Sequence, residues 1–146
     1  GVITVDMPPE ESADYVAALK GQDIAPVFLV APTTDAVRMQ AVCGQGGGFV
    51  YYVSFKGVTG SGSVDLDEVT RKVEAIRGVT ELPVGVGFGI KDAETAGRIA
   101  AVADAVVVGS AVVRRVAEHA AQPERIAGAV GELLVGMRRA MDAARG

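Results

Sequence analysis

The chain has 146 residues, a formal net charge of −4 and a pI near 5.0, a length that suits one compact domain. It is 49% hydrophobic with 19 aperiodic glycines and no basic stripe, which excludes collagen-like, disordered and nucleic-acid-binding proteins. No apolar run approaches the ~20 residues of a membrane span. The one cysteine, Cys43, cannot form an internal disulfide, so we expect a cytoplasmic protein without membrane contact.

Short apolar runs alternate with longer stretches of helical period. The apolar runs are continuous, as is typical of parallel strands covered on both faces. We expect strands at 2–5, 27–30, 49–53, 84–86 and 105–108. We expect helices at 10–20, 35–43, 66–77, 92–101, 111–120 and 123 to about 144.

Proline, glycine and capping residues at the ends of these stretches support the predicted helix boundaries. Pro8 and Pro9 precede the first helix, where a missing N–H does no harm. Gly21 and Gly78 follow helices and suit C-caps, while Asp92 can cap the helix that it opens. By the same argument Thr34 is the predicted cap of the second helix.

Five strand–helix units in series predict an α/β protein with a parallel sheet. A doubly wound, flavodoxin-like sheet would be complete with five strands. A (β/α)₈ barrel needs eight units and about 250 residues, so residues 1–146 would form part of one. The chain opens directly on an apolar run, which we interpret as a cut rather than a natural start.

Glycine-bearing turns follow the last three strands and decide between these architectures. They are the loop 54–63, Gly87-Phe88-Gly89-Ile90 and Gly109-Ser110. Glycines let backbone N–H groups approach an oxyanion, and Ser110 would stand at a helix N-terminus. Three such turns at one sheet edge predict a phosphate site like that of a barrel, whereas a doubly wound sheet carries its glycine fingerprint after the first strand.

The chain resembles one family, the tryptophan synthase α subunit, from its first residue to its last helix. The matching stretches are VDMPPEES (5–12), PVFLVAPTT (26–34), GFVYYVSFKGVTG (48–60), LPVGVGFGI (82–90) and ADAVVVGSAVV (103–113). The resemblance implies a TIM barrel represented by strands 4–8 and retro-aldol cleavage of indole-3-glycerol phosphate to indole and glyceraldehyde 3-phosphate. It also implies a partner β subunit that holds pyridoxal phosphate, with no cofactor or metal in this chain.

The resemblance assigns roles to individual residues. Tyr51 would lie near the reacting glycerol, Asp6 near the reacting end, and Thr59 in the loop that closes over the site. The implied phosphate ligands are Gly60, Gly87, Phe88, Gly89, Gly109 and Ser110. From the residues alone, Tyr51 can also be a core aromatic, with Tyr52 on the opposite face, and Asp6 can be a turn former.

The chain also departs from the family. The family's glutamate–aspartate acid–base pair belongs to barrel strand 2 and the loop after it, which have no match here, so we expect little turnover from residues 1–146 alone. Phe55 stands where many relatives carry a charged residue. A non-catalytic phosphate-binding or assembly module is therefore the alternative function, and another phosphate-binding barrel, such as an isomerase, fits the glycine turns but not VDMPPEES or GVTG.

The predicted sheet has open edges at residues 2–5 and 105–108. Open edges favour pairing with another chain. We therefore expect that the chain is not a stable monomer: it is part of a longer chain, dimerises into a pseudo-barrel, or rearranges to a flavodoxin-like packing.

Overall fold

The computed structural model describes residues 1–54, 65–87 and 89–146. In these residues five parallel strands form one sheet in the order β1-β2-β3-β4-β5. The strands are β1 (Val2–Thr4), β2 (Pro26–Val30), β3 (Val50–Val53), β4 (Val84–Gly87) and β5 (Ala105–Val107). Each lies within two residues of its predicted position.

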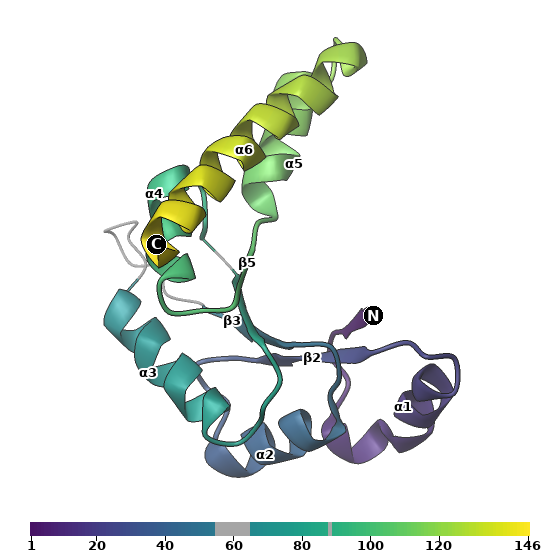
Figure 1. The fold of residues 1–146 in the computed structure, drawn as a ribbon. Coiled ribbons are helices and arrows are strands. Elements are labelled where there is room, and N and C mark those ends of the chain that lie inside the picture. Colours follow the sequence, from purple (N-terminus) through teal and green to yellow (C-terminus); the bar gives the residue numbers. More distant parts are fainter. Residues whose placement is uncertain (55–64, 88) are drawn as a thin grey trace.

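Helices follow the strands in alternation. They are η1 (Pro9–Glu11), α1 (Ala13–Lys20), α2 (Ala36–Gln45), α3 (Leu66–Arg77), α4 (Ala93–Ala100), α5 (Ser110–Glu118), η2 (Pro123–Arg125) and α6 (Ile126–Arg145). Helices α1 to α4 lie along one side of the curved sheet, whereas α5 and the first half of α6 run side by side and project away from it (Figure 1).

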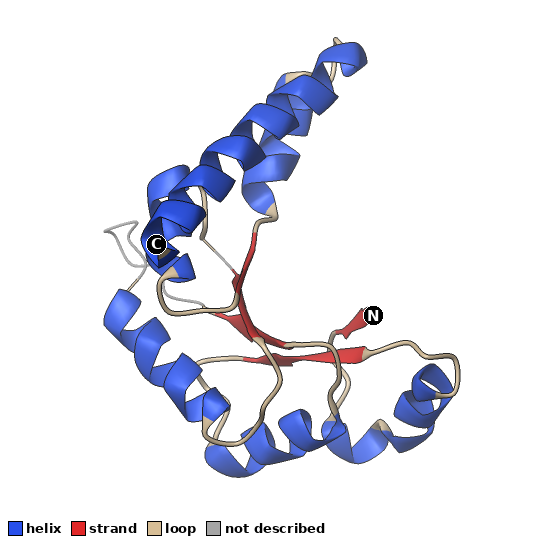
Figure 2. Cartoon of the chain, viewed as in Figure 1, coloured by secondary structure: helices blue, strands red, loops and turns tan. Residues whose placement is uncertain are grey.

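The strand order decides between the two predicted architectures. In a doubly wound sheet the order reverses and helices cover both faces. Here spatial order follows sequence order, and the helices after β1 to β4 lie on one side only (Figure 2). The arrangement is that of an open part of a (β/α)₈ barrel, as predicted, and the flavodoxin-like alternative is wrong.

The core lies between the sheet and the helices that cover it. Alternation along β3 places Tyr52 in this core, 1% exposed, and leaves Tyr51 half-buried on the opposite face, as expected. Burial, reinforced by the charges of Glu68 and Asp65, raises the pKa of Tyr52 to about 12. The largest fully buried side chains of the core include Tyr52, Ile76, Ile99, Val30, Val69, Val73, Val84 and Val86.

The two outer strands of the sheet are open. Among the described strands β1 pairs only with β2, and β5 only with β4. Near the β1 edge Val2, Ile3 and Val5 are 39%, 47% and 61% exposed. The two open edges predicted from the sequence are therefore confirmed.

The helix caps correct one prediction and confirm others. Asp92 caps α4 by accepting from the Thr95 N–H at 2.9 Å, as predicted. The predicted cap Thr34 is wrong: Asp35 accepts from the Arg38 N–H at 2.8 Å, while the Thr34 hydroxyl turns back to the Ala31 N–H at 2.9 Å. The shorter threonine side chain forms its hydrogen bond within the turn, whereas the longer aspartate side chain reaches an N–H group of the first helical turn.

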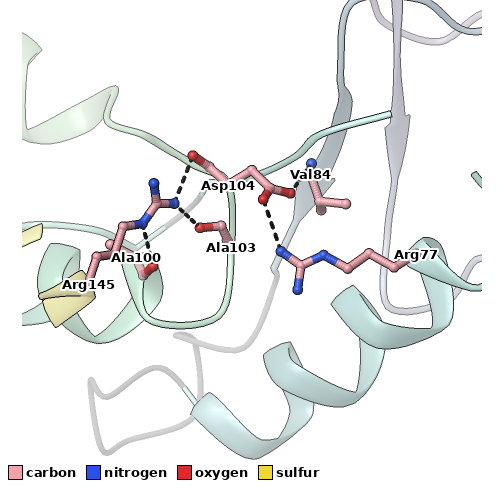
Figure 3. Close-up of polar contacts among 6 residues, drawn as sticks. All are labelled: Arg77, Val84, Ala100, Ala103, Asp104 and Arg145. Carbon is pink, nitrogen blue, oxygen red and sulfur yellow. Dashed lines mark hydrogen bonds and ion pairs between the residues drawn. The ribbon is translucent and has the colours of Figure 1, made fainter. Parts of the chain in front are cut away.

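Asp104 ties together the amino-terminal ends of two strands (Figure 3). Its carboxylate accepts from the Val84 N–H at 2.8 Å and from Arg77 of α3 at 3.1 Å. Arg145, at the end of α6, closes the same corner by donating to backbone carbonyls. Those acceptors belong to Ala100, Ala103 and Asp104. The Val84 N–H, followed by Arg77, lowers the pKa of Asp104, although desolvation opposes them.

We predict that Asp104→Asn makes the protein less stable at neutral pH but not at low pH. The folded-state pKa of Asp104 lies below the unfolded value of about 3.9, so its carboxylate stabilises the fold fully above about pH 3.9. This stabilisation is lost as the pH falls through the folded-state pKa. Because the Asp104 side chain is 43% exposed, solvent screening limits the effect to at most about 1 kcal/mol. Urea unfolding at pH 7, 4 and 2.5 measures it, with exposed Asp67→Asn as the control. A difference that is constant with pH would contradict the assignment.

Helices α4 and α6 pack closely at Gly97. A Cβ built on Gly97 would lie 3.1 Å from the Ala140 carbonyl oxygen of α6. This contact is with backbone, which moves less readily than a side-chain end. The absence of a side chain at Gly97 therefore sets how near the two helices approach.

We predict that Gly97→Val lowers the free energy of unfolding by about 1–3 kcal/mol through overpacking against α6. Gly136→Val is the matched control, because a Cβ at Gly136 in α6 would meet nothing within 4 Å among the described residues beyond its chain neighbours and the nearby backbone of its own helix. The control is expected to change stability by less than about 0.5 kcal/mol. Chemical denaturation measures both, and equal losses would show that Gly97 plays no special part in helix packing.

Candidate functional site

The predicted site residues that the structure describes lie on four of the five strands or directly after them. Tyr51 lies within β3, and Asp6 comes after β1. Gly87 ends β4 and Gly89 follows it, whereas Gly109 and Ser110 connect β5 to α5. Because the strands are parallel, their carboxyl ends lie along one edge of the sheet. Thr59, Gly60 and Phe88 lie outside the described residues.

Tyr51 and Gly87 are in direct contact across neighbouring strands. A Cβ built on Gly87 would lie 2.5 Å from the Tyr51 hydroxyl, so only glycine leaves room for the phenol. The same relation recurs one step down the strands, where the Phe49 ring would meet a Cβ on Gly85 at 3.0 Å. Phe49 and Tyr51 have ring centroids 6.4 Å apart. The sequence reasoning treated Gly87 as a phosphate ligand alone and missed this packing role.

The Tyr51 phenol is neutral at physiological pH. Burial raises its pKa above the ordinary value of 10.0. A neutral phenol can donate or accept a hydrogen bond but cannot act as a general base near pH 7. Tyr51 is therefore suited to orient a hydroxyl group rather than to remove its proton.

The turns after β4 and β5 expose backbone at the same edge. Gly89 has φ +76°, a conformation that residues other than glycine rarely adopt. Gly109 is the N-cap residue of α5 and makes no side-chain cap, and its two chain neighbours aside, no described residue comes within 4 Å of a Cβ built there. Ser110 is exposed at the start of α5. The unpaired N–H groups of a first helical turn and the helix dipole favour an anion at this position.

Asp6 lies at a second part of the same edge. Its backbone is left-handed, with φ 57°, and its side chain is exposed. It lines a cavity of about 460 Å³ between the loops after β1 and β2. Val53 of β3 also lines this cavity, and Val53 shares a face of β3 with Tyr51, two residues before it. Tyr51 itself is not a lining residue, so the structure does not place it with Asp6 in one cavity.

Polar residues that the sequence reasoning did not single out complete this cavity. Thr33 and Arg38 line it from the loop after β2 and from α2. The loop is held from the next unit, because the Lys72 ammonium of α3 donates to the Thr34 carbonyl at 2.7 Å. No local signal in the sequence distinguished Arg38 or Lys72 from other helical cations.

The described residues offer neither a metal site nor a membrane span. Among them no group of three or more His, Cys, Asp or Glu side chains could hold a metal ion. Within the same residues, no helix combines the length and the apolar character needed to cross a bilayer.

Comparison with known proteins gives a consistent result. The family model described as "Tryptophan synthase alpha chain" matches residues 1–142. The chain is 56% identical over 142 residues to the tryptophan synthase alpha chain of Alkalilimnicola ehrlichii, covering 97% of this chain and 52% of that relative. It is 55% identical to that of Thioalkalivibrio sulfidiphilus, with 97% and 53% covered.

Solved structures agree. The crystal structure of tryptophan synthase subunit alpha from Legionella pneumophila superposes with a TM-score of 0.83 at 33% identity, covering 97% of this chain and 51% of that one. The chain spans about half the length of the curated relatives that it matches. With the family model matching nearly all of the 146 residues, the chain belongs to the tryptophan synthase alpha chain family.

Proposed function

We propose that this sequence forms the phosphate-binding part of a lyase of tryptophan biosynthesis that cleaves indole-3-glycerol phosphate to indole and glyceraldehyde 3-phosphate. The observation that carries the proposal is the carboxyl edge of the sheet, where Gly109 and Ser110 begin α5 on the strand next to β4, which Gly87 ends. Tyr51 contacts that turn through Gly87. Membership of the family supports the choice of reaction.

The substrate phosphate would bind along this edge. Backbone N–H groups and the Ser110 hydroxyl would surround its oxygens, and the positive end of the α5 dipole would stabilise its charge. The proposed phosphate ligands are Gly60, Gly87, Phe88, Gly89, Gly109 and Ser110, with Thr59 in the closing loop.

The chemistry needs two proton movements. Breaking the bond between the indole ring and the glycerol carbon delivers a proton to the ring and removes one from a glycerol hydroxyl, which becomes the carbonyl. Tyr51 would orient the glycerol as a neutral phenol, and Asp6 would act near the reacting end. Positioned acid–base groups each contribute about 10²–10⁴-fold, and one carboxylate cannot supply both movements at once. Residues 1–146 alone are therefore expected to bind far better than they turn over.

The proposed partner, cofactor requirement and location follow from the same family. A β subunit that carries pyridoxal phosphate would receive the indole, and this chain would need no cofactor of its own. The cytoplasm is the proposed location.

A second candidate function is a phosphate-binding or assembly module without catalysis. The observation that favours it is coverage, because the chain matches about half of each relative. The resemblance places the family's acid–base pair outside the matched half. Both candidates require phosphate binding, and only the lyase requires turnover once the rest of the barrel is supplied.

We predict that an indole-alkyl phosphate analogue of the substrate binds the chain and that Gly109→Asp weakens this binding at least about tenfold, because a carboxylate would repel the phosphate at the α5 N-terminus. Calorimetric titration measures it. Gly128→Asp in α6 is the control, since a Cβ there would likewise meet no described residue within 4 Å beyond its chain neighbours and the nearby backbone of its own helix. Unchanged affinity in Gly109→Asp would remove Gly109 from the phosphate site, and no binding to the unaltered chain would mean that the site requires the whole barrel.

We propose that the open edges at β1 and β5 pair between copies when the chain is studied alone. Exposed Val2, Ile3 and Val5 make monomers unfavourable, and free backbone groups at each edge can extend the sheet. Sedimentation velocity is expected to show dimers or larger species that grow with concentration. A single monomeric species over a hundredfold concentration range would refute this proposal.

A further inference from the structure

The loop after β1 holds Asp6 in an unfavourable backbone conformation. Its φ of 57° lies in the left-handed region, which costs free energy for a residue with a side chain and persists only where neighbouring contacts impose it. Within the described residues no hydrogen bond joins the Asp6 side chain to another group. The contacts that hold this loop therefore lie elsewhere along it.

A closed set of hydrogen bonds holds the loop three residues further on. The Gln45 side-chain amide donates from Nε2 to the Pro9 carbonyl at 2.8 Å. The Ser12 hydroxyl lies 2.9 Å from the same carbonyl and is in hydrogen-bond contact with Gln45 Oε1. Ser12 has one hydroxyl proton and so donates to one of these two acceptors at a time, and the residue is completely buried.

The anchor belongs to a rigid element, and the segment that it holds is stiff. Gln45 is the last residue of α2, a helix fixed in the core by Met39, Val42 and Cys43. Pro8 and Pro9 have restricted φ, so a fixed Pro9 carbonyl limits the positions open to Asp6. Helix α2, which follows β2, in this way fixes the position of the loop that follows β1.

We infer that Gln45, acting through the Pro9 carbonyl and Ser12, is a positioning residue that keeps Asp6 over the cavity between the β1 and β2 loops. The inference rests on the proposed function for the importance of Asp6, but its structural content stands separately. It differs from a general stabilising role because the effect of losing Gln45 is confined to residues 5–12 and depends on the backbone strain at Asp6.

The experiment compares Gln45→Met with Gln40→Met in the same chain by amide hydrogen exchange. Methionine keeps the length of glutamine and loses both hydrogen bonds, and Gln40 is exposed on the same helix. The amides of Glu11 and Ser12, which donate to the Pro8 and Pro9 carbonyls, are expected to exchange about tenfold faster in Gln45→Met. Those of α3 are expected to be unchanged, and Gln40→Met is expected to match the unaltered chain.

A double-mutant cycle tests the link to Asp6. Glycine adopts φ 57° without strain, so Asp6→Gly is expected to reduce the shift in urea midpoint that Gln45→Met causes. Strictly additive shifts, or faster exchange spread over all elements, would overturn the inference. Turnover of indole-3-glycerol phosphate by Asp6→Asn, with the rest of the barrel supplied, is measured in parallel: unchanged turnover would count against the role proposed for Asp6 and leave the exchange result untouched.

Discussion

The pairing of β3 with β4 is the constraint on which the site depends. Its register sets Tyr51 opposite Gly85 and Val53 opposite Gly87, so the phenol lies across the end of β4. A shift by one residue would turn Tyr51 into the core and bring Tyr52 to the uncovered face. That exchange is prevented by burial, because Tyr52 packs beneath the helices with 1% of its surface exposed. The packing of one tyrosine therefore fixes the direction of the other, and the glycine opposite gives it room.

The two ends of the sheet carry different kinds of residue. At the amino-terminal ends, hydrogen bonds of Asp104, Arg77 and Arg145 join strand, helix and chain end (Figure 3). At the carboxyl ends the backbone is strained or open, as at Asp6, Gly89 and Gly109. This division is the general one in (β/α)₈ barrels, where one face stabilises and the other binds. In this chain the stabilising corner also secures α6, the helix that packs most extensively on α4.

The sequence was informative wherever one local cause determined the structure. Continuous apolar runs located all five strands, alternation separated Tyr51 from Tyr52, and Asp92 capped its helix. It was uninformative where two distant residues must meet. Gln45 lies 36 positions from Pro9, and Arg145 lies 42 from Ala103, so neither contact leaves a trace in any short window. The prediction of Thr34 as the cap was wrong for a different reason. Thr34 and Asp35 are neighbours with similar capping propensity, and only one of them can cap α2. Strand order, likewise, is a property of the assembled sheet, and only the positions of the glycine turns indicated it in advance.

The groups present at the carboxyl edge are suited to binding more than to proton transfer. Backbone N–H groups and the Ser110 hydroxyl can donate hydrogen bonds, and the half-buried Tyr51 phenol, whose pKa is raised, stays neutral. These groups are therefore suited to bind an anion and to orient a hydroxyl group, and not to exchange protons at about pH 7. Asp6 is the one carboxylate among the predicted site residues, and it lines a cavity of which Tyr51 is not part. A retro-aldol cleavage moves two protons at two positions. Among the predicted site residues that the structure describes, those suited to hold an anion or to orient a hydroxyl group therefore outnumber those suited to transfer a proton.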